Sequence, residues 1–324
     1  MVPRRGCLLA AIVAVLLVVG GWSLLGGWYG AGPLAREAAF VVPDGSSLAS
    51  IATKLEKEGA VASADRFRMR ARLFGGGAPI KAGEFLLPKH ASPSKILSVL
   101  QGDEVLRRFV TVPEGMPSIM VYDRLMAQPQ LTGAIAVPPD GSILPDTYEI
   151  ERGETRQAVL LRMQAAMQRS LQELWAKRAP GIAVKTPQEA LALAAIVEKE
   201  TGKPSERRIV AGLYSNRLRQ GIMLQADPTI IYPITRGKPL GRRIRQSEIS
   251  AINDYNTYSM LGLPKAPITN PGKASIEAVL NPANTQALYM VADGTGGHQF
   301  AATLEQHNAN VARWFAIRKA RGEL

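Results

Sequence analysis

The sequence predicts an α+β protein with an N-terminal transmembrane helix, a small module and a larger mixed α/β domain. Three observations lead to this prediction. An apolar run extends from Cys7 to about Tyr29, short strand-like and helix-like segments alternate after it, and the same alternation repeats with longer segments from Arg107 onward. We therefore expect an anchor over residues 1–30, a module over residues 38–106 and a larger domain over residues 107–324.

The apolar run is long enough to span a bilayer. Arg4 and Arg5 precede it, which predicts a cytoplasmic N-terminus, and Trp22, Trp28 and Tyr29 suit the far interface. A cleaved signal peptide is the alternative, although the run exceeds a typical signal and shows no clean cleavage site. We predict a single-pass inner-membrane protein whose C-terminal part is periplasmic.

The formal charge of +12 predicts an anionic partner. Because export separates the chain from nucleic acid, an acidic envelope polymer or a membrane surface is favoured. Cys7 is the single cysteine and lies at the start of the apolar run, so the exported part has no disulfide and no thiol nucleophile.

Metal chemistry and cofactors are not expected. His90, His298 and His307 are scattered, and the sequence contains neither HExxH nor a cysteine ligand set. His298 and His307 could meet in space, and GGHQF could instead be a glycine-rich turn before a strand. The sequence contains no GxSxG motif for a serine hydrolase.

The small module is predicted as strand, helix, helix, strand, helix. The signals are AFVVPDGS, a helix that ends at Gly59, a helix capped by Ser63, the strand IKAGEFLLP, and a helix that begins with Ser92 before Pro93. The first four elements resemble a LysM-like glycan-binding module in their arrangement. The alternative is a structural adaptor that holds the next domain away from the membrane.

The larger domain begins with a strand, a helix, an extended piece and a long amphipathic helix. Two further helices follow, over about Pro187–Thr201 and Ser205–Arg219. IMLQADPTIIYP is then predicted to be extended, and DYNTYSMLGLPKAPITNPG to be a polar loop.

The helix TPQEALALAAIVEKETG has complete boundary signals. Thr186 is the predicted N-cap, Pro187 occupies the first helical position, Glu189 completes a capping box and Gly202 ends the helix. Its apolar residues leave no polar face before Glu198, so we expect it to be buried on nearly all sides.

Two glutamates end this helix. Glu198 and Glu200 lie about 200° apart around the axis, so they cannot form a catalytic carboxylate pair. A carboxyl group in an apolar wall has a raised pKa, which suits a general acid. Alternatively both are surface glutamates, one of them paired with Arg207 or Arg208. The helical periodicity does not choose between them.

The loop after these helices is rich in tyrosine, asparagine and threonine. Such side chains suit sugar hydroxyls, because rings stack on sugar faces and neutral groups donate and accept hydrogen bonds. The residues concerned are Asn253, Tyr255, Asn256, Thr257 and Tyr258.

Seven ordered motifs make the prediction specific. They are IVEKETG, SERRIVAGLYSNRL, GIMLQADPTIIY, YNTY, GLPKAPITNPG, SIEAVLNPA and DGTGGHQF, and PDTY precedes them. Together they resemble the YceG-like family of endolytic murein lytic transglycosylases, known as MltG, from about Phe40 to Trp314. The chain departs from the family pattern at Pro233, Lys265, Ala266 and Gln306, which puts details of glycan contacts in doubt more than the reaction.

The resemblance implies roles for individual residues. It places the catalytic glutamate on Glu198 and a second active-site residue on Tyr258, and it suggests substrate contacts for Asn256, Tyr255, Gln225 and Asp227. The YNTY segment could instead be a hydrogen-bonded loop, and Asp227 could merely start a turn before Pro228.

The implied reaction needs a single carboxyl group. Glycosidases usually use two, but in a lytic transglycosylase the 6-hydroxyl of N-acetylmuramic acid attacks its own anomeric carbon and forms a 1,6-anhydro ring. Glu198 would protonate the glycosidic oxygen and then accept the hydroxyl proton. The implied role is to limit the length of nascent peptidoglycan strands beside cell-wall synthases. The rival is a non-catalytic peptidoglycan-binding scaffold, which would not need Glu198 and Tyr258.

Overall fold

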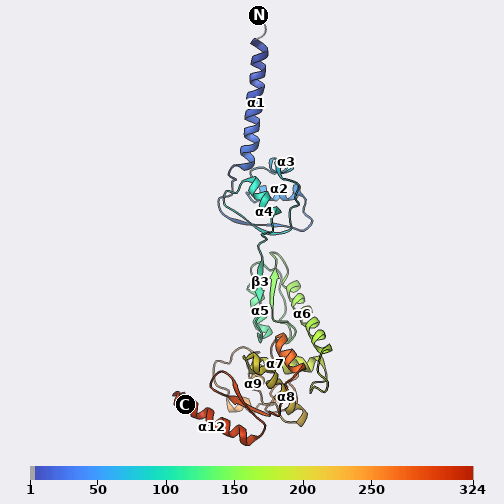
Figure 1. The fold of residues 1–324 in the computed structure, drawn as a ribbon, viewed down its shortest axis with the longest axis vertical. Coiled ribbons are helices and arrows are strands. Elements are labelled where there is room, and N and C mark those ends of the chain that lie inside the picture. The colour runs from blue at the N-terminus through green and yellow to red at the C-terminus, as the bar shows by residue number, and fades with distance from the viewer. Residues whose placement is uncertain (1–3, 324) are drawn as a thin grey trace. The chain divides into compact units, whose positions relative to one another are not determined.

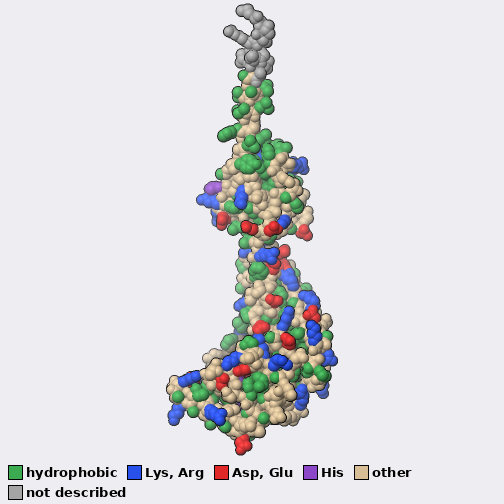
Figure 2. All heavy atoms as spheres, viewed as in Figure 1, with side chains coloured by type: hydrophobic (Ala, Val, Ile, Leu, Met, Phe, Trp, Pro, Cys, Tyr) green, Lys and Arg blue, Asp and Glu red, His purple; other side chains and the backbone are tan. Residues whose placement is uncertain are grey.

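The computed structural model describes residues 4–323, which form two compact units that divide between Arg108 and Phe109 (Figure 1). Helix α1 (Arg4–Tyr29) begins the first unit. Its segment Ala11–Tyr29 is long and apolar enough to cross a membrane, with a mean hydropathy of 2.0. Hydrophobic side chains dominate the visible face of this segment, as a lipid-facing helix requires (Figure 2).

The end of α1 belongs to the core of the first unit. Trp28 is 2% exposed and lies 6.1 Å from both Phe67 and Phe74, measured between ring centroids. Arg70 donates to the carbonyl oxygens of Gly27, at 2.8 Å, and of Ser23, at 3.1 Å. Trp28 therefore packs against protein, and its predicted position at the membrane interface stays a prediction.

The rest of the first unit has the predicted order of elements. They are β1 (Ala38–Val42), α2 (Leu48–Lys57), α3 (Ala64–Phe74), β2 (Gly83–Leu87) and α4 (Pro93–Gln101). The strands pair antiparallel with Phe40 opposite Phe85, and both rings are buried. Ser63 and Ser92 cap α3 and α4 as predicted, each accepting a backbone N–H three residues on.

The second unit is larger and mainly helical. Its elements are β3 (Arg108–Thr111, from the last residue of the first unit), α5 (Ser118–Met126), β4 (Thr147–Ile150), α6 (Arg156–Ala176), α7 (Pro187–Glu200), α8 (Arg207–Gln220), α9 (Asp227–Thr235), α10 (Gln246–Ile249), α11 (Lys273–Leu280), β5 (Tyr289–Ala292), β6 (His298–Ala301) and α12 (Leu304–Ala320). Strand β3 pairs with β4, and β5 pairs antiparallel with β6. A 3₁₀ turn over Pro204–Glu206 leads into α8.

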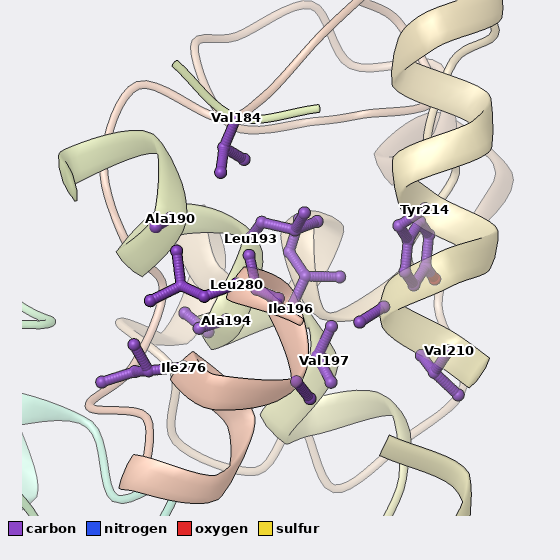
Figure 3. Packing of buried hydrophobic residues seen from close by; sticks show 14 of the residues in the cluster. Val184, Ala190, Leu193, Ala194, Ile196, Val197, Val210, Tyr214, Ile276 and Leu280 are labelled. Atoms are coloured by element: carbon purple, nitrogen blue, oxygen red, sulfur yellow. The ribbon is translucent and has the colours of Figure 1, made fainter. Parts of the chain in front are cut away.

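Helix α7 lies at the centre of this unit. Every residue from Ala192 to Val197 is buried, and α7 packs against α6, α8, α9 and α11. Figure 3 shows Leu193, Ile196 and Val197 of α7 near Ile276 and Leu280 of α11 and Val210 of α8. The predicted N-cap is confirmed, since Thr186 accepts the Glu189 N–H at 3.1 Å. A helix fixed on all sides holds its C-terminal residues in one position.

The segment after α8 differs from its prediction. Residues 227–235 form helix α9, whereas the sequence predicted an extended segment. Pro228 occupies the first turn of the helix, where proline is favoured because that N–H has no helical partner. Buried Thr229 and Ile230 then anchor α9 beneath the polar loop, so the tertiary environment outweighs the strand propensity of TIIY.

Candidate active site

The two glutamates at the end of α7 point to different surroundings. Glu198 accepts the backbone N–H of Gly272 at 2.9 Å, and its carboxylate lies 3.8 Å from the guanidinium of Arg207. Arg207 also binds Glu114 at 3.0 Å. The side chain of Glu198 is 6% exposed. These contacts tie the end of α7 to the two loops that carry Glu114 and Gly272.

Glu200 lies in the wall of a cavity of about 230 Å³. The described residues that line this cavity include Glu200 but not its neighbour Glu198. Burial raises the pKa of Glu200 to about 7; a hydrogen bond with Tyr214 lowers it in part, and the negative charge of Asp227 adds a smaller raising effect. Glu200 therefore has the acid strength that a general acid needs near neutral pH.

Two predicted residues line the same cavity as Glu200. Asp227 and Tyr258 both line it, and the Tyr258 hydroxyl donates to Asp227 Oδ1 at 2.7 Å. Burial and this hydrogen bond raise the pKa of Tyr258 above its ordinary value, which keeps the hydroxyl protonated. The cavity thus combines a protonatable carboxyl group with a second carboxylate that a tyrosine orients.

Gln225 is the third predicted residue that lines the cavity. It adopts a left-handed backbone conformation with φ of 53°, and its side-chain oxygen accepts from Arg217 at 3.2 Å. Arg217 is 7% exposed and also donates to the carbonyl oxygens of Leu224 and Leu288. One buried guanidinium therefore connects α8, the segment before α9 and the start of β5.

Asn256 does not line the cavity, although substrate binding was predicted for it. Its side chain is completely buried; the amide donates to the carbonyl oxygens of Ile249 and Ala251, and its oxygen accepts the Tyr258 N–H at 3.0 Å. These bonds occupy the polar atoms of the amide, so the substrate contact of Asn256 stays a prediction. The alternative of a hydrogen-bonded loop describes Asn256 correctly.

The remaining residues of YNTY also organise the loop. The hydroxyl of Thr257 accepts the Ala226 N–H at 3.0 Å and lies 2.9 Å from the hydroxyl of Thr229 in α9. The ring of Tyr255 lies 4.7 Å from that of Tyr232 and outside the set of side chains that line the cavity. These contacts fix Tyr258 next to Asp227.

His298 is a cavity residue whose role the sequence did not define. Its Nδ1 lies 2.8 Å from Glu206, which also binds the hydroxyl of Thr201 at the end of α7. Burial alone would raise the pKa of Glu206, but its hydrogen bonds with His298 hold it below the ordinary value. His307 instead stacks on Tyr289 at 5.2 Å. GGHQF does lead into a strand, β6, as one of the two interpretations predicted.

Sequence reasoning missed Tyr214 and Arg217. Both line the cavity, and they lie three residues apart on α8, on the face that packs toward α7. Their spacing within SERRIVAGLYSNRL was the available signal. Among residues 4–323, no cluster of three or more His, Cys, Asp or Glu side chains is arranged to hold a metal ion.

The departures from the family pattern have local explanations. Lys265 pairs with Asp254 at 3.0 Å, and Pro233 lies in the last turns of α9. Gln306 accepts the Ala302 N–H at 3.0 Å, while Thr303 caps α12. An amide oxygen performs this capping as well as a carboxylate does.

Comparisons with known proteins identify the family of the chain. The model of the YceG-like family matches residues 40–313. An endolytic murein transglycosylase of Streptococcus pneumoniae serotype 2 is 29% identical over 321 residues, which cover 84% of this chain and 57% of that protein. One from Bacillus subtilis is 25% identical, and the match covers 82% of each chain. The chain thus spans little more than half the length of the streptococcal relative.

A solved structure has a similar fold. The crystal structure of a yceG-like protein from Listeria monocytogenes matches with a TM-score of 0.53 and 24% identity, over 85% of this chain and 98% of that one. Since the family model covers most of the sequence, the resemblance carried by the seven motifs is confirmed. The chain belongs to the YceG-like family.

Proposed function

We propose that this protein is a membrane-anchored endolytic lytic transglycosylase that cleaves the bond between N-acetylmuramic acid and N-acetylglucosamine within peptidoglycan strands. The observation that carries the proposal is Glu200, a carboxyl group with a pKa of about 7 in the wall of a polar cavity. The names of the relatives support the reaction and the substrate class.

Glu200 rather than Glu198 is the proposed general acid. Glu198 already accepts a backbone N–H and lies beside Arg207, so its contacts favour a structural role. Glu200 has the raised pKa and the access to the cavity. This proposal departs from the role that the family resemblance suggested for Glu198.

The proposed reaction balances with one acid–base group. Glu200 donates its proton to the glycosidic oxygen, and the bond from that oxygen to the anomeric carbon breaks. The 6-hydroxyl oxygen of the same muramic acid then bonds to the anomeric carbon, and its proton returns to Glu200. The products are a 1,6-anhydro end and a strand with a free 4-hydroxyl, and no water is consumed.

Asp227 supplies the electrostatic part of the mechanism. Its negative charge lies close enough to Glu200 to raise the pKa of that group, and it would stabilise the positive charge that develops at the anomeric carbon. The Tyr258 hydroxyl fixes the orientation of Asp227 at 2.7 Å. Gln225 presents a neutral amide that suits a sugar hydroxyl.

Cleavage of purified peptidoglycan strands by single variants tests the assignment. Glu200→Gln should reduce the rate of anhydro-muropeptide release by about 10³-fold or more, since it removes both proton transfers. Glu198→Gln is the matched comparison and should retain measurable activity. Mass spectrometry identifies the ends: wild-type activity in Glu200→Gln would refute its role, and reducing ends in place of anhydro ends would identify a hydrolase.

The remaining parts of the proposal concern location and partners. The apolar segment of α1 supports a single-pass anchor, with the N-terminus in the cytoplasm and the catalytic domain in the periplasm. The first unit, with its β1–α2–α3–β2 order, is proposed as a LysM-like glycan-binding module. Limiting the length of nascent strands beside cell-wall synthases is the proposed cellular role.

A further inference from the structure

The residue before Glu200, Lys199, lines a second cavity. It has a volume of about 250 Å³, and Lys199, Pro228 and Ile231 contribute to its wall. Lys199 precedes Glu200, and Pro228 follows Asp227, so the end of α7 and the start of α9 each contribute neighbouring residues to both cavities. Successive residues of a helix point about 100° apart. The ends of the two helices therefore form a ridge between the catalytic cavity and the second cavity.

The second cavity differs in chemistry from the catalytic one. Its described lining is aliphatic apart from two lysines and includes no aromatic ring, hydroxyl or amide side chain; it consists of Lys199, Pro228, Ile231, Gly237, Lys238, Pro239, Leu240 and Ile268. A sugar is recognised by stacked rings and neutral hydrogen-bonding groups. The second cavity instead suits a ligand with small apolar groups and negative charge.

A third cavity continues from the second one. It has a volume of about 440 Å³ and shares Lys238 and Pro239 with its neighbour. Lys238 pairs with Asp123 at 2.9 Å, and Arg124 lies in the wall of the third cavity. Lys199 is exposed, and among residues 4–323 no carboxylate lies within salt-bridge distance of it. Asp123 also lines the third cavity, so the path that leads away from Glu200 on this side is apolar and carries three cations, Lys199, Lys238 and Arg124, against this one carboxylate.

We propose that the second cavity binds the stem peptide attached to the muramic acid that is cleaved. This proposal rests on the proposed function. The peptide begins at the lactyl group of the sugar whose anomeric carbon reacts, so it must leave the catalytic cavity near Glu200. Its alanyl methyl groups match the aliphatic wall, and its free carboxylates match Lys199, since Lys238 already pairs with Asp123.

The length of the peptide is sufficient for this path. An extended chain advances about 3.3–3.6 Å per residue, and a helix with its side chains is about 10–12 Å across. A peptide of three or more residues therefore crosses the ridge and brings its carboxylates to the second cavity. Strands without peptides lose these contacts but keep those of the catalytic cavity.

Kinetics with matched substrates test the proposal. The full-length protein in detergent is given uncross-linked peptidoglycan strands, either intact or after enzymatic removal of the stem peptides. Lys199→Gln should raise KM for intact strands about 3- to 10-fold, which corresponds to one weakened charge-assisted bond, with kcat unchanged. KM for peptide-free strands should not change. Leu240→Glu, which adds a negative charge to the cavity, should likewise raise KM for intact strands and leave KM for peptide-free strands unchanged.

Lys177→Gln is the matched control, because Lys177 is an exposed lysine at the end of α6, outside the three cavities. It should leave both KM values at the wild-type level. An equal rise of KM for both substrates in Lys199→Gln would overturn the proposal, since it would mean that the peptide is not what Lys199 contacts.

A binding measurement separates this proposal from the catalytic one. Calorimetric titration with a soluble muramoyl pentapeptide should show binding to wild type and to Glu200→Gln, and binding to Lys199→Gln about 3- to 10-fold weaker. Equal affinity of wild type for the muramoyl peptide and for peptide-free N-acetylmuramic acid would refute the peptide site. If the wild-type protein does not cleave peptidoglycan strands at all, the proposed function is refuted, and the titration still tests whether the second cavity binds the stem peptide.

Discussion

Glu200 shows how a single position can combine burial with access to a cavity. The buried aliphatic residues of α7 end at Val197, one turn before it, while the carboxyl group itself reaches a cavity lined by Asp227 and Tyr258. Burial disfavours the charged form, which is what a proton donor requires. The same environment should make Glu200 a destabilising residue at high pH.

The pH dependence of activity follows from this pKa. We expect kcat/KM for strand cleavage to fall as pH rises through about 7, because the free enzyme must carry the proton on Glu200. Initial rates across pH 5 to 9 measure this limb. A rate that stays constant between pH 6 and pH 9 would contradict the assignment.

Tyr214 should influence the pH at which kcat/KM falls. Its hydrogen bond with Glu200 stabilises the ionised carboxylate and so lowers the pKa of Glu200. Tyr214→Phe removes the donor, so the alkaline limb of the rate profile should move to higher pH by about half a unit to one unit. Tyr255→Phe provides a control, because Tyr255 does not line the cavity.

The stability of the protein should also reflect Glu200. Its folded-state pKa of about 7 lies above the ordinary value of 4.5, so the folded state binds the proton more tightly than the unfolded state does. Stability should therefore decrease as pH rises from about 4.5 to about 7, and stay constant above that. At pH 8, the free energy of unfolding of Glu200→Gln should exceed that of wild type by about 1–3 kcal/mol, measured by denaturant unfolding. If wild type and Glu200→Gln were equally stable at pH 8, the ionised Glu200 carboxylate would not destabilise the folded protein, and the prediction would be refuted.

At the scale of elements, hydrogen bonds from the surrounding loops hold the cavity together. Asn256, Thr257 and Thr229 join the YNTY loop to α9, and Glu198 joins α7 to Gly272. None of these side chains lines the cavity. Substitution of these residues should therefore affect the stability of the protein and the shape of the cavity directly, and the reaction only as a consequence.

Asn256→Ala is the sharpest test of this framework. It removes two buried donor bonds and the acceptor for the Tyr258 N–H, so we expect a loss of about 2–4 kcal/mol in unfolding free energy. Activity should fall through displacement of Tyr258, with a larger effect on kcat than on KM. Denaturant unfolding and kinetics together measure both; a variant with normal stability but weak substrate binding would point back to a direct contact.

At the scale of the whole molecule, two units have separate hydrophobic cores. The core of the first unit includes Trp28 from the end of α1. The second unit has two clusters of buried residues, one around α7 and one that includes Val110, Leu125 and Met163. Both signs of charge are interspersed over the visible face of the second unit (Figure 2). Separate cores predict that each unit unfolds with its own transition.

Trp28→Ala should lower only the transition of the first unit. The ring is 2% exposed against Phe67 and Phe74, and truncation of a buried aromatic costs about 3–5 kcal/mol. Trp22→Ala is the control, because Trp22 is 81% exposed. Thermal denaturation of the full chain in detergent, with limited proteolysis to identify the unit that unfolds, distinguishes the two. Equal shifts in both variants would exclude a packing role for Trp28.

Local sequence signals predicted most of the elements. Ser63, Ser92 and Thr186 each mark a helix start that the structure confirms, because capping depends on residues only three positions apart. The α9 helix was missed, since TIIY has strand propensity and only burial beneath the loop selects the helix. The role of Trp28 was also missed, because its partners lie some forty residues away in the sequence.

The sequence by itself determined the family, the anchor-like apolar segment and a buried helix that ends in two glutamates. The seven ordered motifs sufficed for the family, and helical spacing sufficed for the burial of α7. Only the tertiary structure distinguished Glu198, bonded to Gly272 beside Arg207, from Glu200, exposed to a cavity with Asp227 and Tyr258. The physical reason is that helical periodicity fixes the angle between two side chains, whereas the pKa and access of each depend on segments distant in the sequence that fold against it.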